Sequence, residues 1–210
     1  MFTSANYRAR HQREMQACAR YAAPLAAAIS SAVPDRFVQV ISDMCSELVN
    51  VRAPIRRTPI GTSPDLQGAR WRYAPPDRIV SGLFELCAYL KNQTSHSPVV
   101  KAVVSHVVIA CLRPFSDGNG RTARVIFNAL ISGSGQTDSL YIPCQRFCEL
   151  SRHGYNIRSR LAHIHGEWND IIVYFCKVIE AYYKTMTRAL RPRSTRSCSV
   201  RGRINNRTAA

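Results

Sequence analysis

The residues with the clearest chemical potential form a short run from Arg113 to Arg124, RPFSDGNGRTAR. A proline ends an apolar stretch there, and a loop with glycines at alternate positions leads into the next predicted helix. Glycine permits positive φ angles and lets a ligand approach the backbone closely. Successive backbone N–H groups in such a loop, backed by the positive N-terminus of a helix, form a site for an anion.

Charged side chains flank this loop. Arg121 and Arg124 are three positions apart, about one helical turn, so both can face the same anion. Asp117 lies beside the glycines, and a single carboxylate in a phosphate site usually holds Mg²⁺. The run therefore predicts a site for a polyphosphate with a metal ion. The alternative is a structural glycine turn capped by Asn119, in which Asp117 and Arg121 merely pair.

The same run resembles the signature of the Fic (Fido) family, H-x-F-x-[D/E]-G-N-G-R-x-x-R. Pro114 is the commonest choice at a looser position, and Arg113 stands where the family has a histidine. The positions that match strictly are Phe115, Asp117, Gly118, Asn119, Gly120, Arg121 and Arg124.

The likeness extends beyond the motif, over roughly residues 53–183. The triplet at 97–99, Ser-Pro-Val, looks like the family's entry to the helix before the motif, and His106 lies seven residues upstream, where many members carry a histidine. Residues 55–74 occupy the place of the family's target-docking hairpin. Later residues that resemble the family pattern are Arg152, Tyr155, Trp168 and Phe175.

The resemblance implies a protein adenylyltransferase, which moves AMP from ATP to a Ser, Thr or Tyr hydroxyl of a target protein. It implies that Asp117 binds Mg²⁺ and that the amides of residues 118–120 hold the α- and β-phosphates. Arg121 would support this anion site, and Arg124 would hold the γ-phosphate and orient the α-phosphate. Residues 55–74 would pair with an extended target segment by strand addition.

Arg113 departs from the family at the position of the catalytic histidine, which takes the proton from the target hydroxyl. A general base needs a pKa near the working pH, whereas arginine has a pKa above about 12 and no acceptor atom. We therefore do not expect Arg113 to act as a base, and losing one typically costs about 10²- to 10⁴-fold in rate.

Three interpretations of this departure stay open. In the first, the domain binds ATP but does not transfer AMP. In the second, it is still a transferase of AMP or another phosphate-containing group, with a different base, and Arg113 stabilises phosphate charge. In the third, which we favour least, it is a basic nucleic-acid-binding protein.

Two other family features bear on activity. His106 lies two helical turns, about 10 Å, before Arg113, which is too far to replace the base, so a structural role is predicted. The family often carries an inhibitory helix, [S/T]-x-x-x-E-[G/N], whose glutamate pairs with the second motif arginine. The segment 81–85 has this spacing but is followed by Leu86 and lies in the wrong part of the chain. Self-inhibition by this device is therefore not expected.

The elements that must position the motif are predicted to be helices. The expected fold is all-α, a Fic-type helical bundle with a small β-hairpin flap. Prolines and glycines between residues 52 and 76 indicate the flap. Ser97 followed by Pro98 is a strong helix start. Apolar residues at helical spacing predict helices at 98–112, 120–131, 143–150, 153–163 and 168–190.

Three regions are expected: an N-terminal helical extension at 1–52, a Fic-like domain at 53–188 and a basic disordered tail at 189–210. The Ala-rich stretch 21–33 is interrupted by Pro24 and is expected to be a short helix on the domain rather than a targeting segment. The chain has 210 residues and a formal charge of +16. Such a field attracts polyanions.

Composition also bears on location. No apolar run approaches the ~20 residues that cross a bilayer, so no membrane insertion is predicted. The eight cysteines form no C-x-x-C pair, which favours buried free thiols in a reducing compartment. We expect a cytoplasmic, bacterial protein. Its basic tail is either a solvated segment or, as in several family members secreted through type IV machinery, a signal for export to a host cell.

Overall fold

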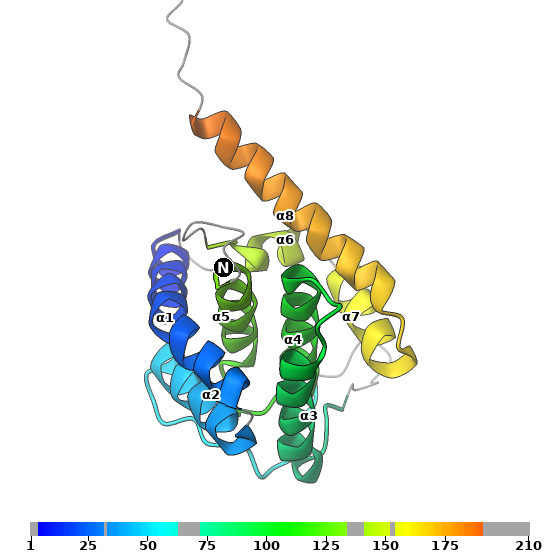
Figure 1. The fold of residues 1–210 in the computed structure, drawn as a ribbon. Coiled ribbons are helices and arrows are strands. Elements are labelled where there is room, and N and C mark those ends of the chain that lie inside the picture. Colours follow the sequence, from blue (N-terminus) through cyan, green and yellow to red (C-terminus); the bar gives the residue numbers. More distant parts are fainter. Residues whose placement is uncertain (1–3, 32, 63–71, 134–140, 152–153, 191–210) are drawn as a thin grey trace, which may run out of the picture.

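The computed structural model describes residues 4–31, 33–62, 72–133, 141–151 and 154–190. Within these ranges the protein is helical (Figure 1), and the all-α prediction is confirmed. The two described arms of the predicted flap meet in one antiparallel bridge, between Gly61 and Arg72. The middle of the flap, and the predicted tail beyond residue 190, lie outside the described residues.

The helices are bounded as follows. They are α1 (Ser4–Ser31), α2 (Pro34–Val49), α3 (Ile79–Asn92), α4 (Pro98–Leu112), α5 (Asn119–Ser132), α6 (Cys144–Leu150), α7 (Gly154–His165) and α8 (Trp168–Leu190), with a 3₁₀ turn, η1 (Pro76–Arg78), before α3. Of the described helices, none is long and apolar enough to cross a membrane.

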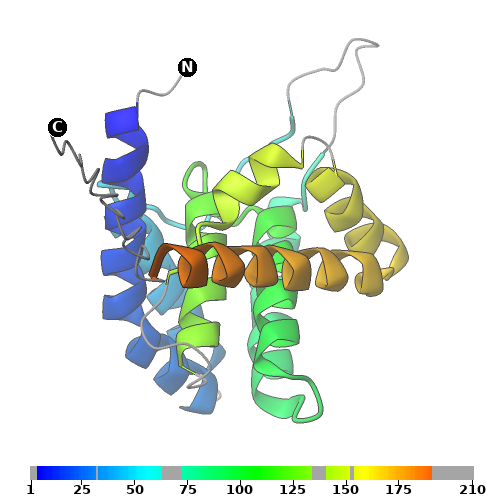
Figure 2. The ribbon, with the colours of Figure 1, turned by 90° about the horizontal axis from the view of Figure 1, so that it is seen from above.

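The antiparallel pair α4 and α5 forms the centre of the molecule. Helices α1 and α2 pack on one side of this pair, whereas α7 and α8 lie on the other (Figure 1). Seen at 90°, α8 crosses in front of the central helices (Figure 2), and it contacts both α4 and α7. The loop between α4 and α5 contacts α2 and the base of the flap.

Helix α4 begins and ends where the sequence predicts. Ser97 caps its N-terminus, and the Ser97 Oγ accepts a hydrogen bond from the Val100 N–H at 3.3 Å. Its C-cap is Arg113, which adopts a left-handed conformation with φ of 45°. Left-handed backbone is uncommon for residues other than glycine. The turn at the end of α4 therefore sets the direction of the Arg113 side chain, and the left-handed backbone of Arg113 costs free energy.

Helix α5 starts after a second left-handed residue, Gly118, with φ of 82°. A Cβ atom at this position would lie 2.6 Å from the Val49 Cγ1 and 2.8 Å from the Cys45 Sγ. Neither the backbone angle nor the close approach of α2 admits a side chain. The motif loop is thus fixed by two left-handed residues and by packing against α2.

Helix α1 differs from the prediction. It runs through Pro24 to Ser31, so the short helix expected at 21–33 is instead the end of a helix of 28 residues. Ala17, Leu25 and Ala28 are fully or almost fully buried in the same core as α2, α3 and α5. Because burial of this face offsets the hydrogen bond that proline removes, α1 is a long helix integral to the core.

Candidate functional site

Two adjoining cavities open at the motif loop. The larger, of about 500 Å³, lies between the flap arms, α4, α6 and α7. The smaller, of about 300 Å³, lies over the N-terminus of α5. Both are lined by Arg113, Asn119, Gly120 and Arg124, so they form one continuous site. Its volume is in the range of small-molecule sites.

The smaller cavity brings the predicted anion-binding residues together. Residues 116–121, Arg113 and Arg124 all line it. Two further lining residues, Arg10 of α1 and Gln145 of α6, were not predicted from the sequence. The cavity lies over the first turn of α5, where backbone N–H groups lack partners within the helix, and such a position favours an anion.

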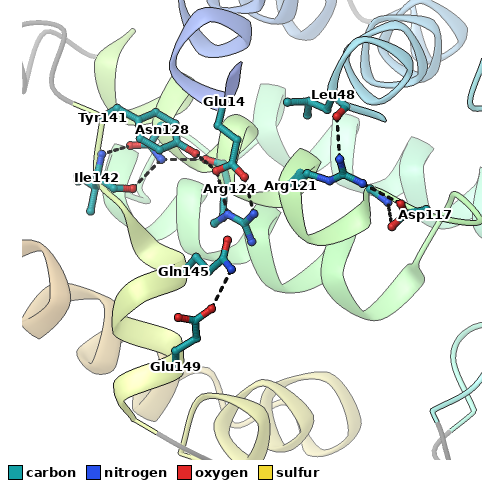
Figure 3. A network of polar contacts seen from close by, with 11 residues as sticks. Glu14, Leu48, Asp117, Arg121, Arg124, Asn128, Tyr141, Ile142, Gln145 and Glu149 are labelled. Carbon is teal, nitrogen blue, oxygen red and sulfur yellow. Dashed lines mark hydrogen bonds and ion pairs between the residues drawn. The ribbon is translucent and has the colours of Figure 1, made fainter. Parts of the chain in front are cut away.

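Asp117 and Arg121 are held by the chain itself. The Asp117 Oδ1 accepts a hydrogen bond from the Gly118 N–H at 2.6 Å, and its Oδ2 pairs with the Arg121 Nη2 at 2.8 Å. The Arg121 Nη1 donates to the Leu48 carbonyl at 2.8 Å, as Figure 3 shows. Arg121 therefore ties the start of α5 to the end of α2. The structural pairing considered from the sequence is present within the anion site.

The Asn119 side chain shapes the loop rather than facing the cavity. Its Oδ1 accepts from the Phe115 N–H at 2.9 Å, and its Nδ2 donates to the Phe115 carbonyl at 2.8 Å. Both residues are buried. At Asn119, the group left for a ligand is the backbone amide in the first turn of α5.

Arg124 is engaged by a glutamate. The Arg124 Nε lies 3.0 Å from the Glu14 Oε2, and its Nη2 lies 2.5 Å from the Glu14 Oε1. The Tyr141 hydroxyl donates to the same carboxylate at 2.5 Å (Figure 3). The side chains of Arg124 and Glu14 are only 13% and 5% exposed. Although burial lowers the pKa of Arg124, the contact with Glu14 raises it above its ordinary value.

The search for the inhibitory pattern missed the glutamate that pairs with the second motif arginine. Glu14 lies in Arg10-His11-Gln12-Arg13-Glu14-Met15, which lacks both the hydroxyl residue and the glycine or asparagine of the inhibitory pattern. The one sequence feature that could have drawn attention to Glu14 is that it is the only acidic residue among the first 34. By occupying Arg124, Glu14 withholds the guanidinium that the resemblance assigns to the γ-phosphate.

Arg113 lies where the two cavities meet. Its guanidinium carbon is 4.3 Å from the ring centroid of Tyr73 in the flap arm, a cation–π contact. Its carbonyl accepts from the Nε of the buried Arg56 at 2.6 Å. A cation joined to the flap thus occupies the place of the family's base.

His106 is a core residue, in line with the predicted structural role. It is 4% exposed, lies against the rings of Phe127 and Phe175, and its Nε2 is 3.0 Å from the Tyr155 hydroxyl. Burial, with a smaller contribution from Arg124, lowers the pKa of His106 to about 3. The imidazole is therefore neutral at physiological pH and only weakly basic.

Comparison with known sequences gives a family match. Residues 33–131 match the Fic/DOC family model. A probable protein adenylyltransferase of Aquifex aeolicus is 29% identical over 68 residues, which are 32% of this chain and 21% of the relative. The protein adenylyltransferase fic-1 of Caenorhabditis elegans is 31% identical over 68 residues, 30% of this chain and 13% of the relative.

Solved structures show the same fold. Fic-1 from C. elegans matches with a TM-score of 0.57 and 20% identity, over 84% of this chain and 51% of that one. A Fic family protein from Desulfovibrio desulfuricans matches with a TM-score of 0.60 and 16% identity, over 91% of this chain and 69% of that one. The chain therefore contains a Fic domain, and it spans about half the length of the C. elegans structure.

Proposed function

We propose that this protein is a nucleotide-binding module on a Fic adenylyltransferase scaffold that does not itself transfer AMP. The observation that carries the proposal is Arg113, which stands at the junction of the two cavities. Its guanidinium has no acceptor atom, so it cannot take a proton from a hydroxyl.

Binding of a nucleotide is supported by the shape and charge of the site. The cavity of about 500 Å³ is large enough for a nucleoside, and the adjoining space over α5 is lined by arginines. Backbone amides of Asn119 and Gly120 are proposed to hold phosphate oxygens there, since the Gly118 N–H already donates to Asp117. ATP is the nucleotide that the adenylyltransferase relatives suggest.

The test measures transfer of label from α-labelled ATP to protein, with Mg²⁺ and a cell lysate. Four proteins are compared: wild type, Arg113→His, Glu14→Ala and the double variant. Histidine tolerates left-handed backbone better than most residues, so it suits the φ of 45° at position 113. Only proteins with Arg113→His are expected to transfer label, most strongly the double variant. Label transferred by wild type or by Glu14→Ala alone would contradict the proposal.

A second candidate, a transferase with another base, is favoured by one observation. Glu149 of α6 lines the same cavity as Arg113, and its Oε1 accepts from the Gln145 Nε2 at 2.8 Å (Figure 3). A carboxylate accepts a proton where a guanidinium cannot. If the wild type transfers label and Glu149→Gln does not, this second candidate replaces the first.

A target protein is proposed to dock on the flap, residues 55–74. Its described arms are antiparallel, and the Tyr73 N–H donates to the Ile60 carbonyl at 3.2 Å. An extended peptide could add to such an arm by main-chain hydrogen bonds. Loss of partner capture by a chain with residues 63–71 replaced by Gly-Ser repeats, with nucleotide binding retained, would support it.

A further inference from the structure

The phosphate half of the site is crowded with guanidinium groups. The smaller cavity is lined by four arginines against one carboxylate, that of Asp117. The four are Arg10, Arg113, Arg121 and Arg124. Like charges gathered in one concave site repel each other and raise the local concentration of anions. The cavity is therefore built for a ligand that brings several negative charges.

Two of these arginines already have a carboxylate partner. Arg124 makes its two contacts with the buried Glu14, and Arg121 pairs with Asp117. Arg113 differs: within the described part of the chain it forms no ion pair, and its guanidinium stacks on Tyr73. The repulsion it exerts is visible at Arg56, whose pKa is lowered by burial and by the charge of Arg113. Arg113 thus presents an uncompensated cation to the site.

The same arrangement does not suit a divalent cation. Both Asp117 oxygens already accept contacts, from the Gly118 N–H and from Arg121. A cation entering this cavity would also face the four arginines. The charge of the phosphates is better neutralised by guanidinium groups that are already in place.

The positions available to phosphates are two. One is beside Arg113, where the larger cavity meets the smaller, and the second is over the backbone amides of Asn119 and Gly120. The third, at Arg124, is taken by Glu14. A third phosphate would have to break an ion pair whose partners are buried, which is strongly unfavourable.

We propose that the site binds a nucleoside diphosphate without a divalent metal ion, with Arg113 as the residue that holds the phosphate next to the ribose. This inference rests on the proposed nucleotide-binding function. It gives the arginine at the family's histidine position a binding role. The guanidinium can offer two N–H groups to one phosphate, which a histidine cannot.

Isothermal titration of the full-length protein tests the inference. The probes are ADP, GDP, CDP and UDP and the corresponding triphosphates, each with EDTA and with MgCl₂. One diphosphate is expected to bind in EDTA at least about tenfold more tightly than its triphosphate, with no gain from Mg²⁺. Arg113→Gln is expected to weaken that binding by at least about tenfold, the loss of one charge-assisted hydrogen bond.

Two control variants distinguish the loss of a positive charge from the loss of the contact between Arg113 and the phosphate. Arg36→Gln removes the same charge from an exposed position on α2 that lines neither cavity, and it is expected to leave binding unchanged. Arg113→Lys keeps the charge without the planar fork, so intermediate affinity is expected. Circular dichroism and melting temperature establish that each variant is folded.

Three outcomes decide against the inference. Tighter binding of a triphosphate with Mg²⁺ than of its diphosphate overturns it while leaving the proposed nucleotide-binding function standing. Wild-type affinity in folded Arg113→Gln removes the role of Arg113. Failure of every nucleotide to bind overturns both this inference and the proposed function.

Discussion

Some polar side chains of the motif stabilise its loop instead of contacting a ligand. Asn119 is the clearest case, since both ends of its amide bind the backbone of Phe115. Asn119→Ala would leave a buried N–H and a buried carbonyl without partners, at a cost of about 2–4 kcal/mol in the free energy of unfolding. Asn119→Asp keeps the acceptor for the Phe115 N–H but sets a second acceptor against the Phe115 carbonyl, so it should also destabilise the fold. Urea unfolding measures both, and an alanine variant as stable as wild type would contradict this role.

His106 predicts how stability depends on pH. Its pKa is lowered from 6.5 to about 3 in the folded protein, by burial and then by Arg124. Between these values the unfolded chain binds a proton that the folded chain does not, so stability is lost as pH falls from 6.5 toward 3. The slope from this one group is at most about 1.4 kcal/mol per pH unit.

His106→Phe removes the titration and keeps an aromatic ring beside Phe127 and Phe175. Chemical unfolding of both proteins at pH 7, 6, 5 and 4 gives the comparison. The variant's stability should fall less steeply over this range, whatever its absolute value at pH 7. Parallel curves for the two proteins would show that His106 does not contribute.

At the scale of the structural element, the position of the flap depends on one buried arginine, Arg56. The Arg56 side chain donates to four backbone carbonyls: those of Thr58 and Ala74 in the flap arms and of Leu112 and Arg113 at the end of α4. This guanidinium holds both arms of the flap against the turn that leads into the motif loop.

Arg56→Lys cannot make these contacts, because an ammonium lacks the planar fork that reaches several acceptors. We expect proteases to cut between residues 57 and 74 at least several-fold faster, while most of the helical content is retained. Limited proteolysis followed by mass spectrometry measures the cleavage. Arg57→Lys, at the exposed neighbouring position, is the control. Equal cleavage of the Arg56→Lys variant and the wild type would show that Arg56 does not hold the flap.

The helices that frame the motif could be predicted because their signals are local. The Ser97 cap, the proline after Arg113 and the glycines at 118 and 120 all act within a few residues. The ion pair between Glu14 and Arg124 joins positions 110 apart. The stacking of Arg113 on Tyr73 likewise depends on how the flap folds back. Such contacts follow from tertiary packing, and no spacing rule along the chain indicates them.

At the scale of the whole molecule, the expected N-terminal extension packs into the same core as the helices of the family match. The family match begins at residue 33, after α1. Yet α1 packs on α2 and α5, buries Leu25 in the common core and supplies Glu14 to the site. The segment that matches the family is therefore not expected to be stable by itself.

Deletion of residues 1–32 tests this dependence. Each large apolar side chain lost from a core costs about 1.5–3 kcal/mol, and a buried Arg124 without its carboxylate costs about 3–5 kcal/mol more. Together these losses approach the whole stability of a typical domain, about 5–15 kcal/mol. The truncated chain should therefore lose its cooperative thermal transition. Deletion of residues 191–210 removes no described core residue and should leave the transition in place. A cooperative transition in the chain that lacks residues 1–32 would contradict this expectation. It would mean that α2 to α8 form a stable core without α1, and that the pairing of Glu14 with Arg124 is not needed for the fold.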